Sequence, residues 1–181
     1  MSKAHFEREN YDESKPIRIW FGNLEKYNEG ILRGMWLSLP MDEDLLKAAM
    51  ADVLGDSEEW LLNDWECSIE GLVCEHADPI KLNSIAEELE KLDSFDFLKV
   101  AYLIENEGYG IEEAIEKYED VVVYEGMRPE KVAEVLVDDG CFGDIPDALA
   151  GYIDYKAIAR DLVFDGYHYD VESSNTYHFM G

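Results

Sequence analysis

The sequence predicts an α+β protein in which a small antiparallel sheet is followed by helices and then by a second sheet with helices. Short β-branched and aromatic runs stand at residues 17–21 (I-R-I-W-F) and again at residues 121–124 (V-V-V-Y). Between these runs, apolar residues recur at the three- to four-residue spacing of helices. Apolar residues make up 47% of the 181 residues, which is enough to bury a core and excludes wholesale disorder.

The first 77 residues predict a leader, a sheet and one helix. Residues 1–15 are polar and mixed in charge, so we expect a flexible leader. Residues 17–21 and 31–39 predict strands, separated by turn residues. Pro40 ends the second strand, Asp42 can cap a helix that runs to about Leu54, and residues 59–68 predict a third strand.

From Pro79 the pattern becomes mainly helical. Apolar residues fit a helical period loosely up to Ile104, and again from Ile111 to Tyr118. The later elements are a strand at 121–124, helices at 129–137 and 145–162, and an edge strand at 176–179. After the leader we therefore expect three small consecutive domains: 16–77 (sheet plus helix), 78–119 (helical) and 120–181 (sheet plus helices).

The net charge is the most unusual property of the chain. It contains 15 Lys and Arg against 42 Asp and Glu, which gives −27, whereas a small soluble domain needs a net charge of only about 2–8 in magnitude. Residues 1–41 are neutral, so the excess lies in residues 42–181, where acids alternate with Leu, Ile, Val and Tyr. Interleaved acids predict a charged surface on folded elements, not an acidic tail. Such a surface excludes nucleic-acid binding through a basic patch and argues against an anionic membrane as partner.

No targeting or membrane segment is apparent. Residues 1–15 lack the apolar run of a signal peptide, and no apolar run approaches 18 residues. Cys67, Cys74 and Cys141 are an odd number and too few for a disulfide scaffold. We therefore expect a cytoplasmic protein with reduced cysteines.

Two patterns resemble metal sites. Asp161, Asp165, Gly166 and Glu172 match part of a calcium loop, but position 3 of that loop is Val163, which cannot ligate. A calcium-dependent enzyme or sensor would depend on this loop.

The second pattern comprises Cys67, Cys74 and His76, which lack zinc-knuckle spacing and a nearby fourth ligand. No H-E-x-x-H or G-x-S-x-G motif is present. We therefore expect no metal, no cofactor, no small-molecule substrate and no catalytic activity.

The spacing of some acids suggests a use for the charge. Glu112, Glu116 and Asp120 follow at four-residue intervals, which would place them on one ridge if a helix reached that far. Each such like-charged pair costs roughly 0.2–0.5 kcal/mol. At the charge density of duplex DNA, one charge per roughly 1.7 Å, a charge of −27 would match about 46 Å of duplex, or some 13–14 base pairs. The surface could therefore imitate DNA. A merely solvated acidic surface remains an alternative, as does halophilic adaptation, against which the neutral first 41 residues count.

Two longer strings resemble the ArdA family of antirestriction proteins. Residues 17–30 (I-R-I-W-F-G-N-L-E-K-Y-N-E-G), with G-M-W-L at 34–37, are similar to that family's opening strand, turn and second strand. Residues 149–162 (L-A-G-Y-I-D-Y-K-A-I-A-R-D-L) are similar to its antirestriction motif. The resemblance runs from about Pro16 to the end, and residues 1–15 extend beyond the family's usual start.

This resemblance implies an elongated, curved protomer that pairs through its C-terminal domain into a homodimer imitating bent B-form DNA. Such proteins, carried by mobile genetic elements, occupy the DNA-binding groove of type I restriction–modification enzymes and block restriction and often modification. The acids that we predict to stand in for phosphates are Asp56, Glu58, Glu59, Glu87, Glu88, Glu90, Glu112, Glu116 and Asp120. The motif residues are Leu149, Tyr152, Ile153, Asp154, Tyr155, Arg160, Asp161 and Leu162.

Within the motif, we expect Tyr152, Ile153 and Tyr155 to make the dimer contact, with packing inside the domain as the alternative. A different function is an acidic adaptor that binds a basic DNA-associated protein without copying the shape of DNA.

Overall fold

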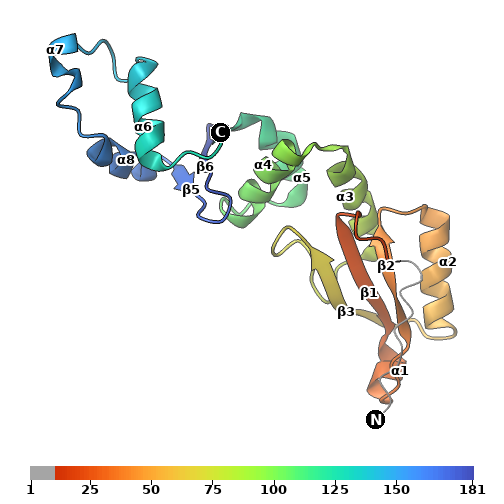
Figure 1. Cartoon of the computed structure of the whole chain (residues 1–181). Helices are drawn as coiled ribbons and strands as arrows, with labels where there is room; N and C mark the ends of the chain where they lie inside the picture. The colour runs from red at the N-terminus through yellow and green to blue at the C-terminus, as the bar shows by residue number, and fades with distance from the viewer. Residues whose placement is uncertain (1–10) are drawn as a thin grey trace. The chain divides into compact units, whose positions relative to one another are not determined.

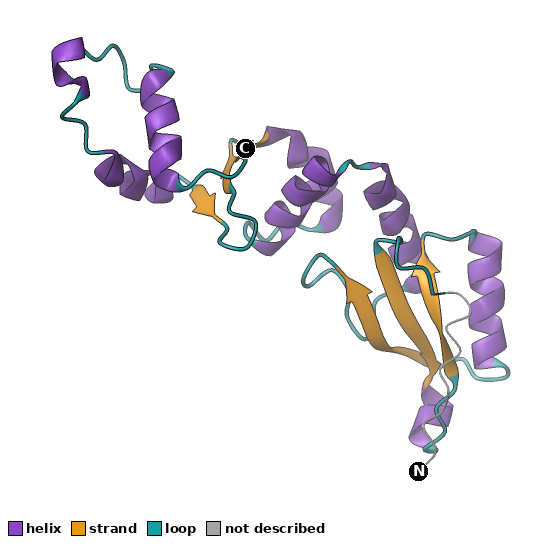
Figure 2. Cartoon of the chain, viewed as in Figure 1, coloured by secondary structure: helices purple, strands orange, loops and turns teal. Residues whose placement is uncertain are grey.

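The computed structural model describes residues 11–181, and the chain divides into two compact units, Met1–Ile115 and Glu116–Gly181 (Figure 1). We call them the N-terminal unit and the C-terminal unit. Each contains helices and a three-stranded antiparallel sheet (Figure 2). The α+β class predicted from the sequence is confirmed, and the division into three domains stays a prediction.

The N-terminal unit begins with a sheet and continues with helices. Its elements are β1 (Ile17–Asn23), α1 (Leu24–Asn28), β2 (Gly34–Leu39), α2 (Glu43–Leu54), β3 (Trp60–Cys67), α3 (Pro79–Lys91), α4 (Ser94–Glu105) and most of α5 (Ile111–Lys117). The three predicted strands and the helix after Asp42 are confirmed. The predicted turn after β1 is wrong, because the side chain of Asn23 accepts a hydrogen bond from the Lys26 amide and starts the short helix α1.

The sheet has the strand order β2-β1-β3 and one fully buried face. Ile17, Ile19 and Phe21 alternate along β1 and, with Leu37 and Leu39 of β2, are inaccessible to solvent. Helix α2 contacts β1 and β2, and two of its own side chains are buried. The side-chain amide of Asn23 donates through Nδ2 to the carbonyls of Val53 and Leu54, which holds the end of α2 on the sheet.

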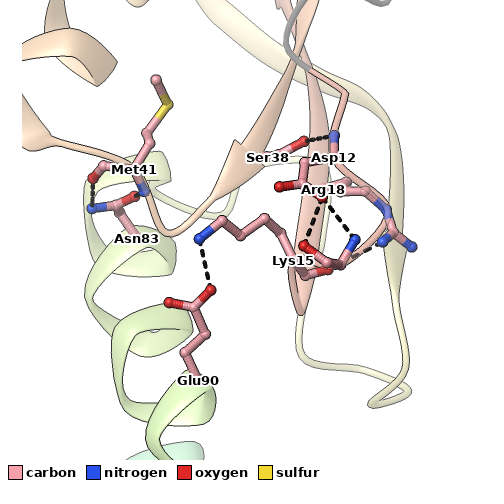
Figure 3. A network of polar contacts seen from close by, with 8 residues as sticks. Asp12, Lys15, Arg18, Ser38, Met41, Asn83 and Glu90 are labelled. Carbon is pink, nitrogen blue, oxygen red and sulfur yellow. Dashed lines mark hydrogen bonds and ion pairs between the residues drawn. The ribbon is translucent and has the colours of Figure 1, made fainter.

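Residues 11–15, the described part of the expected leader, lie against the sheet. The Tyr11 ring meets Trp36 edge-on at 5.5 Å between centroids, and its hydroxyl donates to Glu66. The Asp12 amide donates to Ser38 Oγ at 2.8 Å (Figure 3). These contacts differ from the expected flexibility of this part of the segment, and residues 1–10 lie outside the described residues.

The C-terminal unit is built from two packed helices and a small sheet. It comprises the 3-10 turn η1 (Tyr118–Asp120), β4 (Val121–Tyr124), α6 (Pro129–Asp138), α7 (Asp147–Ala150), α8 (Tyr155–Phe164), β5 (Tyr167–Tyr169) and β6 (Thr176–Phe179). Helices α6 and α8 pack around a core of Val132, Ala133, Ala159 and Leu162.

Two predictions for this unit are wrong. The helix expected over 145–162 is broken into α7 and α8, because the side chain of Asp154 caps a new helix after Gly151. The strand at 176–179 is central, not an edge, because β6 pairs with β4 on one side and β5 on the other. Strand β5 was not predicted, since Y-H-Y is too short to show an alternating pattern.

Candidate functional site

Carboxylates cover the surface of the described residues. No Asp or Glu among residues 11–181 is buried, and all are exposed except four half-buried ones, Glu66, Asp96, Glu134 and Asp170. We call the exposed acids the carboxylate surface. Ionised groups stay on the surface because removing them from water costs free energy unless each is paired.

The nine predicted acids come from four places in the fold. Asp56, Glu58 and Glu59 lie between α2 and β3, just after Gly55 ends the helix with a φ of 61°. Glu87, Glu88 and Glu90 lie on the exposed part of α3, and Glu112 and Glu116 on α5. Asp120 ends η1. All nine side chains are exposed, and whether these acids dominate binding stays a prediction.

Asp120 does not continue the helical ridge of Glu112 and Glu116. The α-helix ends at Lys117, and a 3-10 turn with about three residues per turn follows it. The β-branched run that forms β4 starts at Val121, so the chain leaves the helix before Asp120. The condition for a three-acid ridge is therefore not met, whereas the i, i+4 pair of Glu112 and Glu116 is kept.

Within residues 11–181, three of the predicted acids have ion-pair partners. Glu88 pairs with Lys91 at 2.6 Å on the same helix, Glu90 with Lys15 at 2.6 Å, and Glu112 with Lys81 at 2.9 Å. These carboxylates keep 43–75% of their side-chain surface exposed, so the pairs contribute little to stability. The i, i+3 spacing of Glu88 and Lys91 is readable in the sequence, but the other two pairs depend on the fold.

Hydrogen bonds stabilise the charge of three other carboxylates. Main-chain amides of Asp96 and Phe95 donate to Asp93 at the start of α4 and lower the pKa of its carboxyl. Ser14 lowers the pKa of Asp12 through its hydroxyl and its amide. Ser173 has the largest part in lowering the pKa of Asp170 in the β5–β6 turn. Each group therefore holds its negative charge to lower pH than an ordinary aspartate.

Residues 149–162, the candidate antirestriction motif, divide between the core and the surface. Leu162 is buried beside Val132, and half-buried Tyr155 packs against the same core. By contrast, Leu149 is 55% exposed and Tyr152 is 86% exposed. Asp154 Oδ1 accepts a hydrogen bond from the Ala157 amide at 3.0 Å and starts α8.

The remaining predicted motif residues lie at the surface or close to it. Ile153 is half-buried, whereas Arg160 and Asp161 are exposed on α8. Further along, Val163 and Phe164 add exposed apolar surface that the sequence-based prediction did not include. The sequence did contain a signal for this exposure. In a helix with one buried face, the two residues that follow a buried residue such as Leu162 point away from that face, and here they are Val163 and Phe164.

The family described as antirestriction protein (ArdA) matches residues 19–176. The chain belongs to the ArdA family. The match includes the sheet residues from Ile19 onward and the whole of residues 149–162. No curated protein matches the chain.

Membership in the ArdA family assigns an antirestriction function to this protein. The matched region begins within β1, so residues 11–15 and their contacts with the sheet lie before it. Residues 16–18 also precede the match, although the string that carried the resemblance starts at Ile17.

The candidate metal ligands show no convergent cluster. Within residues 11–181, no group of three or more His, Cys, Asp or Glu side chains is placed to hold a metal ion. Asp161 lies inside α8 and Glu172 follows β5, so the calcium-like pattern spans a helix end and a strand. Burial raises the pKa of the Cys67 thiol.

None of the described helices combines the length and apolar character needed to cross a bilayer.

Proposed function

We propose that this ArdA-family protein inhibits type I restriction–modification enzymes by occupying their DNA-binding groove with carboxylates in place of phosphates. The observation that carries the proposal is the carboxylate surface, in which no described Asp or Glu is buried. With a net charge of −27 and every described acid at the surface or half-buried, the chain presents a polyanionic surface. In the cytoplasm it would protect DNA brought in by a mobile genetic element.

Binding would depend on many similar contacts. A groove that holds DNA presents Lys and Arg to phosphates, and these cations pair equally well with carboxylates, with Arg making two parallel hydrogen bonds. On α5, Glu112 and Glu116 are separated by about 6 Å along the axis, because each residue rises about 1.5 Å. Blocking the groove in this way would inhibit restriction and modification together, since both need bound DNA.

We also propose that the protein acts as a homodimer formed by its C-terminal unit. This unit leaves Leu149, Tyr152 and Phe164 exposed in or next to the motif, and Phe164 is 88% accessible. Exposed aromatic side chains of this size are enriched at protein interfaces. Tyr152 therefore supports the predicted dimer contact, whereas Tyr155 contributes to the core of its own protomer.

Competition for DNA tests the proposed function. A fluorescent duplex bound to the DNA-recognition core of a type I methyltransferase would be titrated with the full chain and the released duplex measured by anisotropy. We expect stoichiometric displacement. Lysozyme, a basic protein without a DNA groove, is the control and should bind little.

Matched variants sharpen this test. Replacing Glu87, Glu88 and Glu90 together by Gln keeps the shape of α3 and removes three charges, so displacement should weaken by roughly three- to tenfold, if each exposed contact contributes about 0.2–0.5 kcal/mol. Glu116→Gln alone should change it by about twofold or less on the same scale. A single substitution that abolished inhibition would contradict a shared polyanionic surface. Absence of displacement, with equal binding to lysozyme, would instead favour the acidic adaptor.

A further inference from the structure

Helix α3 carries one polar residue on its buried face. The other buried side chains of this helix are apolar, and they include Leu82, Ile85 and Leu89. Asn83 is only 3% exposed. Burying an amide costs free energy unless its donor and acceptor are both satisfied, so its presence among apolar residues requires a specific partner.

The partner of Asn83 is the main chain of Met41. The Met41 amide donates to Asn83 Oδ1 at 2.9 Å, and Asn83 Nδ2 donates to the Met41 carbonyl at 2.9 Å (Figure 3). Met41 lies between β2 and α2, so this paired hydrogen bond joins α3 to the junction of the sheet and its covering helix. Helix α3 contacts both of these elements.

This paired hydrogen bond adds a directional constraint on α3 to its apolar packing. Hydrophobic contact is non-directional, whereas both hydrogen bonds require the side chain of Asn83 to face the main chain of Met41. A shift of one residue turns a helix by about 100° and moves it about 1.5 Å, which would break both hydrogen bonds to Met41. The Lys15–Glu90 pair also reaches α3, but it is exposed and therefore weak (Figure 3).

The rotation of α3 decides where its acids point. Glu87, Glu88 and Glu90 are exposed on this helix, and α2 begins with the exposed acids Glu43 and Asp44. We propose that Asn83 is a positioning residue that holds the α3 acids in register with those of α2, so that both groups meet the cations of one partner. The inhibitory part of this inference rests on the proposed function, whereas the placement of α3 does not.

Spin-label distances test the placement directly. The full chain would carry labels at Ala48→Cys on α2 and Ser84→Cys on α3, both exposed positions, after Cys67→Ser, Cys74→Ser and Cys141→Ser. Into this background we would introduce Asn83→Leu, which keeps the number of side-chain heavy atoms and their branching and removes both hydrogen bonds. Asn83→Asp is the second variant, because its ionised carboxylate cannot donate to the Met41 carbonyl. Ile85→Val is the matched control, since it weakens packing on the same face without touching Met41.

We expect the distance distribution to broaden or shift in both Asn83 variants and to stay unchanged in Ile85→Val. In the DNA competition, the Asn83 variants should lose roughly three- to tenfold in potency, as expected when three exposed charge contacts are misplaced. An unchanged distribution in both Asn83 variants would overturn the positioning role. A changed distribution with full potency would overturn its link to inhibition. If the unsubstituted chain displaces no DNA, the proposed function fails, and the distances still decide the role of Asn83.

Discussion

In the N-terminal unit, Ile17, Ile19 and Phe21 are fully buried on one face of the sheet, which α2 contacts, whereas the helix pair of the C-terminal unit packs around two alanines beside Val132 and Leu162. The units also differ in what they leave outside. The most exposed large apolar side chain among the described N-terminal residues is Leu45, at 62%, but Tyr152 and Phe164 exceed 85%. The C-terminal unit therefore leaves its apolar side chains more exposed than the N-terminal unit does, and this is the surface that we propose pairs two protomers.

The largest effect is expected from Leu162→Ala, because the C-terminal core has few other side chains to fill the space. Removing a buried leucine side chain costs about 2–5 kcal/mol. Hydrogen exchange should then show loss of amide protection in β4, α6, α8 and β6, with β1 and β2 still protected. Leu37→Ala is the matched substitution in the N-terminal unit and should give the opposite pattern. Uniform loss of protection in both variants would show that the units unfold as one.

Tyr152→Ala should weaken self-association without disturbing the fold of the protomer, because the ring is almost fully exposed there. We expect the dimer dissociation constant to rise at least tenfold, which corresponds to about 1.4 kcal/mol. Sedimentation velocity at micromolar concentration measures this change. Tyr27→Ala is the control, since Tyr27 is an exposed tyrosine of the N-terminal unit. If both variants sediment like the unsubstituted protein, the dimer contact does not include Tyr152.

Asp154→Ala should destabilise the C-terminal unit by about 0.5–2 kcal/mol, because it removes the side chain that starts α8. Asp161→Ala removes an equal charge from the same motif, at an exposed position within α8. Chemical denaturation followed by far-ultraviolet circular dichroism compares the two. Equal midpoints would show that the cap contributes nothing beyond its charge.

The smallest expected effect is a loss of folding stability at alkaline pH. Burial, together with a hydrogen bond to Tyr124, raises the pKa of Tyr167 to about 12 from a usual value of 10. A raised pKa means that the folded state favours the neutral hydroxyl. The contribution of Tyr167 to folding stability is therefore fully present below pH 10 and is lost as the pH rises towards 12. Tyr167→Phe should therefore flatten the fall in melting temperature between these pH values. If the melting temperature of Tyr167→Phe falls as steeply as that of the unsubstituted protein, groups other than Tyr167 cause the fall.

Local signals in the sequence were sufficient for most elements. The β-branched and aromatic runs gave β1, β2, β3 and β4, and Asp42 marked the start of α2, because strand propensity and helix capping act over a few residues. The break between α7 and α8 was missed, since apolar spacing continues across it, although Gly151 ends α7 and Asp154 starts α8. The central place of β6 depends on pairing with residues more than 50 positions away, which no local pattern encodes.

For the candidate site, composition predicted the carboxylate surface but not its geometry. That acids lie outside follows from the cost of burying charge. The pairing of Glu90 with Lys15 depends on where residues 11–15 meet the sheet, and the sequence-based prediction left that segment flexible. The role of Asn83 was likewise hidden, because an asparagine within an amphipathic pattern usually indicates an exposed position.

The central position of β6 has a consequence for the order of synthesis. Residues 176–179 join β4 to β5, so the C-terminal sheet cannot assemble on the ribosome until they have been made. The N-terminal sheet needs only residues up to Cys67. During translation the N-terminal unit can therefore fold first, and the surface proposed to pair two protomers is completed last. A nascent chain would then carry a folded, acidic N-terminal unit before its C-terminal unit, which we propose forms the dimer, has folded.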